Sequence, residues 1–176
     1  RGDFGYSVQT GAAVSTLLAT ALPSSLVLAG GGLGLAVVLA VLIAVAATFG
    51  PPFVRQAFAA LPPLFVSIPV FFVGIVLVQI FSFRLGLIPA IGADPAQALV
   101  LPVATLAIPL SAPLAQVLIR SIDEVRARPF VDVVRARGAS DTWLLWRNIA
   151  RNAVLPALTM AGLIFGELVG GAVVTE

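Results

Sequence analysis

Arginine is concentrated in one stretch of this chain, and that stretch is where the side chains are best suited to chemistry. Eleven of the eighteen charged residues, including seven of the ten basic ones, fall between Arg120 and Arg151. Guanidinium groups bind carboxylates and phosphates through several hydrogen bonds at once. The cluster therefore indicates a surface that meets water and docks a partner.

Several kinds of catalytic site are excluded by the residue types that the sequence lacks. It has no cysteine, histidine or lysine, which rules out disulfides, thiol nucleophiles and histidine general bases. The phosphate-binding motif GxxxxGK[ST] is absent as well, so we expect no nucleotide hydrolysis by this chain. Its net charge of +2 is too small and too local to indicate nucleic-acid binding. We expect a protein that is not an enzyme and holds no metal or cofactor of its own.

The rest of the chain is apolar enough to lie in a lipid bilayer. Hydrophobic residues make up 60% of it and charged residues 10%, with a mean hydropathy of +1.10, whereas soluble domains average ~25% charged residues. Three charge-free gaps, at residues 4–54, 56–83 and 95–119, each exceed the ~20 residues that span hydrocarbon as a helix. Residues 33–47 are apolar at nearly every position, which excludes the alternating pattern of a β-barrel.

We expect an all-α, polytopic transmembrane helix bundle. The first helix is expected to start at residues 23–25, Pro-Ser-Ser, and to stop at residues 50–52, Gly-Pro-Pro. Pro69 is expected to kink the second span, and Pro156 to mark the entry of the fourth. The four predicted spans are residues 26–49, 62–83, 96–121 and 153–174.

Arginine placement predicts how these spans cross the membrane, because short loops rich in basic residues stay in the cytoplasm. The loop of residues 122–152 is therefore assigned to the cytoplasmic side. Counting through four spans then places residues 1–22 and Glu176 outside and residues 50–60 inside. The chain opens on Arg1 rather than methionine, so we also expect it to be a piece of a longer protein.

The cytoplasmic loop is expected to contain two short helices. Residues 129–137 are predicted to form the first, which Gly138 ends because glycine suits the left-handed position beyond a helix. Ser140 and Asp141 are placed to cap a second helix at residues 142–150. That helix has large side chains at helical spacing, namely Trp143, Trp146, Ile149 and Ala153. The loop is interpreted either as a solvated face with membrane-anchoring tryptophans or as a helix–turn–helix docking unit.

Short motifs in and after this loop support the second interpretation. Ala136-Arg137-Gly138 is followed by Arg151-Asn152 and by Leu155-Pro156, while residues 1–5 and 170–176 carry further matching segments. The residue types and spacing of these motifs resemble those in the membrane-spanning subunits of bacterial ABC importers, in the branch that serves dipeptides, oligopeptides and nickel. Asp132-Val133-Val134 stands where the general EAA motif of these subunits has a glutamate and two alanines. The resemblance runs from one end of the chain to the other.

This resemblance implies one permease domain over residues 1–176, a fragment lacking a preceding and a following span, with residues 122–152 as its coupling loop. It implies a multi-pass protein of the bacterial inner membrane that translocates dipeptides or oligopeptides by alternating access. The implied partners are a second homologous permease subunit, two ATP-binding subunits that hold ATP and Mg, an extracytoplasmic substrate-binding protein and membrane lipid, with no nucleic acid. Docking of the ATP-binding subunits is assigned to Asp132, Arg135, Arg137, Gly138, Ala139, Ser140 and Asp141.

Glu167 lies inside the fourth predicted span. An ionisable group at mid-membrane costs ~2.5–3.5 kcal/mol on insertion scales, so it should face a polar cavity or a partner. It is interpreted either as part of the translocation path, binding the ammonium end of a peptide, or as a protonated or paired residue in a helix interface. Stripes of small residues are also expected to allow close helix packing, and their members are Gly30, Gly34, Gly162, Gly166 and Gly170.

Other functions fit parts of the same pattern. A nickel or nickel-chelate importer shares the motifs, although the absence of histidine and cysteine argues against soft-metal coordination within the spans. A secondary transporter or channel would use the loop only for regulation, and Glu167 would be its only intramembrane charge for ion coupling. A membrane scaffold would use the loop only to anchor a partner.

Overall fold

The computed structural model describes residues 4–89, 94–144, 147 and 150–175. These residues are almost entirely helical, apart from turns and one isolated antiparallel bridge between Tyr6 and Ala13. The predicted all-α membrane bundle is therefore confirmed. The helices are α1 (Val14–Phe49), α2 (Pro52–Val66), α3 (Val70–Leu77), the π-helix η1 (Val78–Arg84), α4 (Pro95–Arg126), α5 (Pro129–Ala136), α6 (Asp141–Leu144) and α7 (Ala150–Thr175).

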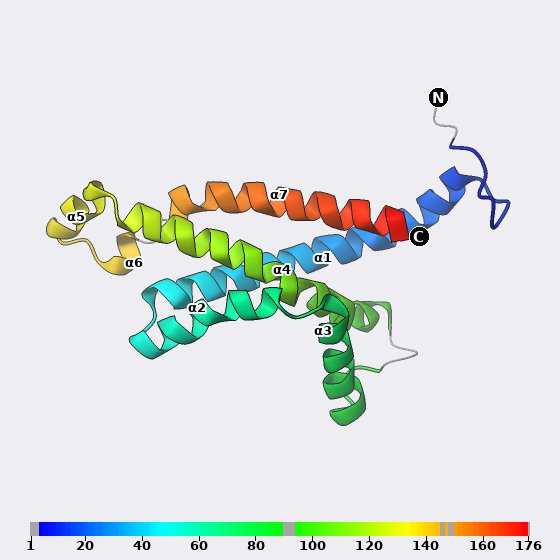
Figure 1. Ribbon diagram of the computed structural model, residues 1–176, viewed down its shortest axis with the longest axis horizontal. Helices are drawn as coiled ribbons and strands as arrows, with labels where there is room; N and C mark the ends of the chain where they lie inside the picture. Colours follow the sequence, from blue (N-terminus) through cyan, green and yellow to red (C-terminus); the bar gives the residue numbers. More distant parts are fainter. Residues whose placement is uncertain (1–3, 90–93, 145–146, 148–149, 176) are drawn as a thin grey trace.

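Three long helices, α1, α4 and α7, run along the long axis of the molecule, as Figure 1 shows. Helix α1 packs extensively against α4, and α7 packs against both. The short helices α5 and α6 lie at one end of this bundle, and the N-terminal segment and the last turns of α7 lie at the other. The loop and the N-terminal segment therefore lie at opposite ends, as the predicted topology requires.

Helix α1 begins well before its predicted start. Residues 23–25 lie inside it, and the helix begins at Val14, which corrects the expected start. Ser24 does not act as a cap, because its hydroxyl donates to the Ala21 carbonyl within the helix at 2.8 Å. The predicted stop is confirmed. Gly50 ends the helix, and a Cβ there would lie 2.6 Å from the Ala46 carbonyl oxygen, so the turn needs glycine.

The second predicted span is not one kinked helix. Helix α2 ends at Val66, and the segment of α3 and η1 leaves at a bend of 110°. The amides of Ser67 and Ile68 turn back to carbonyls three residues earlier. Pro69 then disfavours helical geometry in the residue before it and has no N–H to donate. The break therefore falls next to the predicted proline, but it is far sharper than a kink.

Helix α4 corresponds to the third predicted span. It carries Pro102, Pro109 and Pro113 inside it, and it continues beyond the expected end at residue 121 to Arg126. The connection that was predicted to start at residue 122 therefore starts with a further turn of helix. The long membrane helix and the loop thus join at Arg126 without a flexible linker.

The number of spans is smaller than predicted. Among the described residues, α1 and residues 96–126 are long and apolar enough to cross a membrane, and the bent α2–α3 pair adds a third if it counts as one span. The expected count of four is therefore wrong on this basis. Residues 153–174 do form part of helix α7, but Arg151, Asn152 and Glu167 reduce the hydropathy of its described part.

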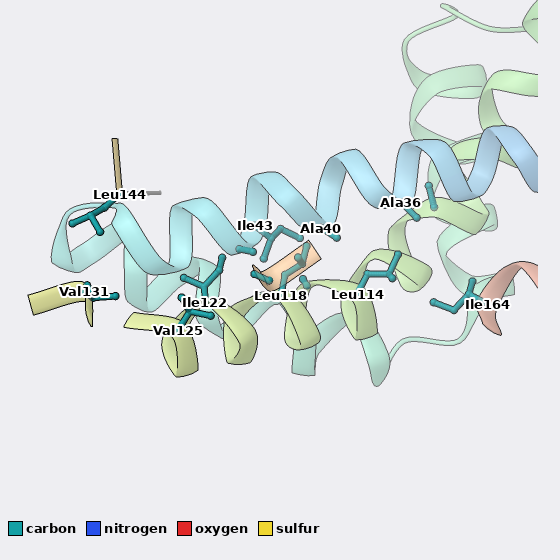
Figure 2. Packing of buried hydrophobic residues seen from close by; sticks show 14 residues of the cluster. Ala36, Ala40, Ile43, Leu114, Leu118, Ile122, Val125, Val131, Leu144 and Ile164 are labelled. Carbon is teal, nitrogen blue, oxygen red and sulfur yellow. The ribbon is translucent and has the colours of Figure 1, made fainter. Parts of the chain in front are cut away.

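The core forms where α1, α4 and α7 meet. Figure 2 shows Ala36, Ala40 and Ile43 of α1 on the side that faces Leu114 and Leu118 of α4. Buried alanines on both helices let the two backbones approach closely, and Ile43, Leu114 and Leu118 fill the space between them. The same cluster continues to the loop end of the bundle, where it includes Ile122, Val125, Val131, Leu144 and Ala153.

Within the described chain, close packing occurs at other glycines than those of the predicted stripes, whose packing against a partner stays a prediction. A Cβ added at Gly30, Gly34, Gly162 or Gly166 would meet nothing within 4 Å, so these positions do not pack within the described chain. Close contact instead occurs at Gly32, where a Cβ would lie 3.3 Å from Leu106 Cβ, and at Gly31 and Gly74. Both Gly31 and Gly32 contact α4, through Val103 and Leu106. The side-chain environment of Gly170 lies outside the described residues.

Replacing Gly32 by valine is expected to lower the stability of the bundle. Gly32 is buried, and the added methyl groups would push against Leu106, an overpacking cost of about 1–3 kcal/mol. The measurement is the thermal unfolding midpoint of the detergent-solubilised protein. Gly34→Val is the matched control, because the same side chain there enters open space. Equal midpoints for the two variants would contradict the packing described here.

Candidate functional site

Helix α5 and the turn after it have the geometry that the sequence predicts. Pro129 occupies the first turn of α5, and the helix stops at Ala136. Gly138 has φ +89°, in the region that favours glycine. The amide of Gly138 donates to the Arg135 carbonyl at 2.9 Å and that of Ala139 to the Val134 carbonyl at 3.4 Å. This pair of bonds is a Schellman motif, and it fixes the direction in which the chain leaves α5.

Ser140 opens the next helix, as predicted. Its hydroxyl oxygen accepts a hydrogen bond from the Trp143 amide at 3.3 Å, which is an N-cap contact. Helix α6 is described over Asp141–Leu144. The predicted continuation through Trp146 and Ile149 lies outside the described residues, as does the side chain of Asp141. The helix–turn–helix arrangement is thus present, with a described second helix shorter than expected.

Two buried side chains anchor this unit to the bundle. Val131 of α5 and Leu144 of α6 are each 1% exposed and belong to the same apolar cluster as Val125 of α4 and Ala153 of α7. Figure 2 shows Val131 near Val125 at the end of α4. The sequence pattern marked neither Val131 nor Leu144. Trp143, which it did mark by helical spacing, is 48% exposed.

The remaining face of α5 and its turn is open to solvent. Val133 is 52% exposed and Phe130 is 38% exposed, and Arg137 is exposed at helical spacing from both. Asp132, Arg135, Gly138 and Ser140 are exposed too, while Ala139 is half-buried. We call Phe130, Val133 and Arg137 the α5 face. A surface that combines apolar side chains with a guanidinium group is suited to contact with another protein.

Within the part of the chain that the structure describes, no group of three or more His, Cys, Asp or Glu side chains could hold a metal ion. Asp132 and Arg135 on α5 and Arg137 beside the turn are exposed to solvent. Their arrangement supports recognition of a partner surface.

Comparison with known families agrees with this geometry. Residues 36–176 match the family of binding-protein-dependent transport system inner membrane components, and this match covers more than half of the chain. The chain belongs to this family. The resemblance inferred from the short motifs is therefore confirmed at the level of the family.

Curated relatives of this inner membrane component include the glutathione transport system permease protein GsiC of Escherichia coli K12 and that of Salmonella choleraesuis SC-B67. Each is 40% identical over 111 residues, which are 63% of this chain and 36% of the relative. The chain thus matches little more than a third of the length of these relatives. A crystal structure of an amino acid ABC transporter with histidines superposes with a TM-score of 0.67, covering 91% of this chain and 71% of that one at 17% identity. At this identity the likeness concerns the fold alone.

Glu167 lies on α7, away from the α5 face. Its side chain is exposed, as are Gly162 and Gly166 on the same helix. Apolar side chains on α7 are exposed as well, among them Leu155 at 67%, Leu158 at 61% and Leu163 at 62%. This helix therefore presents a mixed surface with one carboxyl group, and the role of Glu167 stays a prediction.

Proposed function

We propose that this inner membrane component forms part of the translocation path of an ATP-driven importer for small peptides. Family membership and the fold support an ABC importer subunit. The name of the GsiC relatives, which refers to transport of glutathione, a tripeptide, supports a peptide substrate. Dipeptides and oligopeptides share the same backbone and charged ends, and the motifs resemble those of the branch that transports them.

The observation that carries the proposal is the anchored helix–turn–helix unit with an exposed α5 face. Because Val131 and Leu144 fix the unit to the bundle, a force on α5 acts directly on α4 and α7. A separate ATP-binding subunit would contact the α5 face and the turn after it. The assigned docking residues are Asp132, Arg135, Arg137, Gly138, Ala139, Ser140 and Asp141.

The proposed mechanism separates ATP hydrolysis from the movement of the membrane helices. The ATP-binding subunits hold ATP and Mg and carry out hydrolysis, so this chain performs no covalent step. Their closure moves the docked unit, and the long helices shift between inward-open and outward-open packing, which is a change in populations driven by the nucleotide state. A second homologous permease subunit and lipid would cover the exposed apolar side chains of α1 and α7. A substrate-binding protein would dock at the opposite end of the bundle.

Glu167 is proposed to belong to the surface that substrates pass. A carboxyl group exposed on a membrane helix is costly in lipid, so a polar path or a partner subunit is its favourable environment. A carboxylate there would attract the ammonium end of a peptide. The adjacent Gly162 and Gly166 would let a neighbouring subunit or substrate approach the helix closely.

Val133→Asp tests the docking proposal. The carboxylate would be placed at the centre of the α5 face, where a partner would desolvate it, while free solvation in the isolated chain leaves the fold intact. We expect the ATP-binding subunits to stop co-purifying with the permease, and uptake of radiolabelled glutathione into whole cells to fall to background.

Gln9→Asp is the matched control, because it adds the same carboxylate at an exposed position in the N-terminal segment, at the other end of the molecule. It should keep ATPase binding. Undiminished co-purification and uptake with Val133→Asp would overturn the proposal. So would ion-driven uptake by a permease that binds no ATPase.

A further inference from the structure

The C-terminal end of α1 leaves carbonyl groups without backbone partners. In a continuing helix the Thr48 carbonyl would accept the amide of residue 52, but residues 51 and 52 are both proline and have no N–H. Thr48 is only 3% exposed, so water does not readily take the place of that donor. A buried carbonyl in this position needs a donor from elsewhere in the fold.

Arg126 supplies the donor from a position 78 residues along the chain. Its Nη1 donates to the Thr48 carbonyl oxygen at 3.0 Å, and its guanidinium carbon lies 5.1 Å from the centroid of the Phe49 ring. The cation thus sits at the negative end of the α1 dipole and over an aromatic face, both of which favour it. We call this contact of Arg126, Thr48 and Phe49 the α1 cap.

The α1 cap joins the last turn of α1 to the last turn of α4, and its two ends lie 78 residues apart along the chain. Arg126 is the last residue of α4, and α5 begins at Pro129. On the other side of the α1 cap, Thr48 and Phe49 belong to the last turn of α1, directly before the Gly50 turn into α2. A displacement of α5 can therefore reach the α1–α2 turn through the Arg126 side chain, in addition to the apolar packing of α4 against α1 and α2.

We propose that Arg126 is a positioning residue that transmits movement of the docked α5 to the end of α1 and the start of α2. This inference rests on the proposed function, because it assumes that an ATP-binding subunit moves α5. The apolar contacts of Val131 and Leu144 hold the loop to α4 and α7. Arg126 adds a directional, charge-assisted link to α1, so that the three long helices move together.

The test uses the assembled importer, with its ATP-binding subunits, in proteoliposomes. The chain has no cysteine of its own, so spin labels on Ala57→Cys at the start of α2 and Gln97→Cys at the start of α4 report the distance between these exposed positions. ATP binding should change this distance. In Arg126→Gln we expect the ATP-driven change to be lost, and glutathione moved per ATP hydrolysed to fall about fivefold, while the ATP-binding subunits still co-purify.

Two further variants separate transmission from simple stabilisation. Arg128→Gln removes an exposed arginine two positions away and should keep the wild-type distance change. Arg126→Lys retains a donor and a positive charge and should restore part of the change, whereas a general loss of stability would leave it unrestored. An ATP-driven distance change in Arg126→Gln equal to wild type would overturn this inference and leave the proposed function standing. Failure of the wild-type chain to bind any ATPase would overturn both.

Discussion

Replacing Val131 by aspartate is expected to abolish transport by detaching the helix–turn–helix unit from the bundle. Val131 is 1% exposed and packs in the cluster that links α4, α5, α6 and α7. A carboxylate left unpaired in that environment costs on the order of 3–5 kcal/mol. Local hydrogen bonding in the twelve described helical residues of α5 and α6 does not offset this cost. The unit should therefore unfold while the membrane helices stay packed.

Limited proteolysis and hydrogen exchange measure this outcome directly. Cleavage of Val131→Asp should concentrate between residues 127 and 150, and amide protection in α5 should disappear, with protection in α1 and α4 unchanged. Val133→Asp carries the same chemical change on the exposed side of the same helix. It should lose ATPase docking but keep the proteolytic pattern of wild type. Retained docking by Val131→Asp would show that the unit does not need this anchor.

Replacing Gly138 by valine is expected to lower uptake roughly tenfold, because the left-handed backbone costs an L-residue ~1–2 kcal/mol. Gly138 has φ +89°, and a Cβ there would meet nothing within 4 Å. Valine at this position is therefore expected to strain the backbone, and its side chain does not clash with other parts of the chain. With the turn displaced, Ala139 and Ser140 would no longer hold the positions that the Schellman motif and the N-cap give them.

Gly138→Asn is the matched control, since asparagine tolerates left-handed backbone far better than a β-branched residue. The measurements are co-purification of the ATP-binding subunits and initial rates of glutathione uptake. If the turn geometry matters, Gly138→Asn should retain most of the activity that Gly138→Val loses. Equal loss in both would mean that the partner itself contacts the glycine closely. Equal retention would contradict a role for the turn.

Local signals predicted the elements whose boundaries depend on the chain itself. The stop of α1 at Gly50, the end of α5 before Gly138 and the cap at Ser140 each follow from residues within one turn of the boundary. Where a residue type fits more than one local structure, the predicted boundary or bend was wrong. The first helix was expected to start at residues 23–25, but Ser24 bonds back within α1. Pro69 was expected to kink a helix that instead turns by 110°.

The candidate site was predicted in part. The turn residues and their exposure agree with the sequence, and their contact with an ATP-binding subunit stays a prediction. The anchors Val131 and Leu144 and the link through Arg126 were not foreseen. Nothing local marks them, because a valine on α5 or an arginine at the end of α4 acquires its role only from what another helix brings against it.

The sequence by itself determined the membrane-embedded helical class, the family and the helix–turn–helix of the loop. Each of these depends on composition or on residues close in the chain, whose energetics are local. Only the tertiary structure decided which glycines pack, which loop side chains are buried and which cation completes the end of α1. Those outcomes depend on the relative rotation and register of α1, α4 and α7, which are set by the sum of many small packing contacts between residues far apart in the chain.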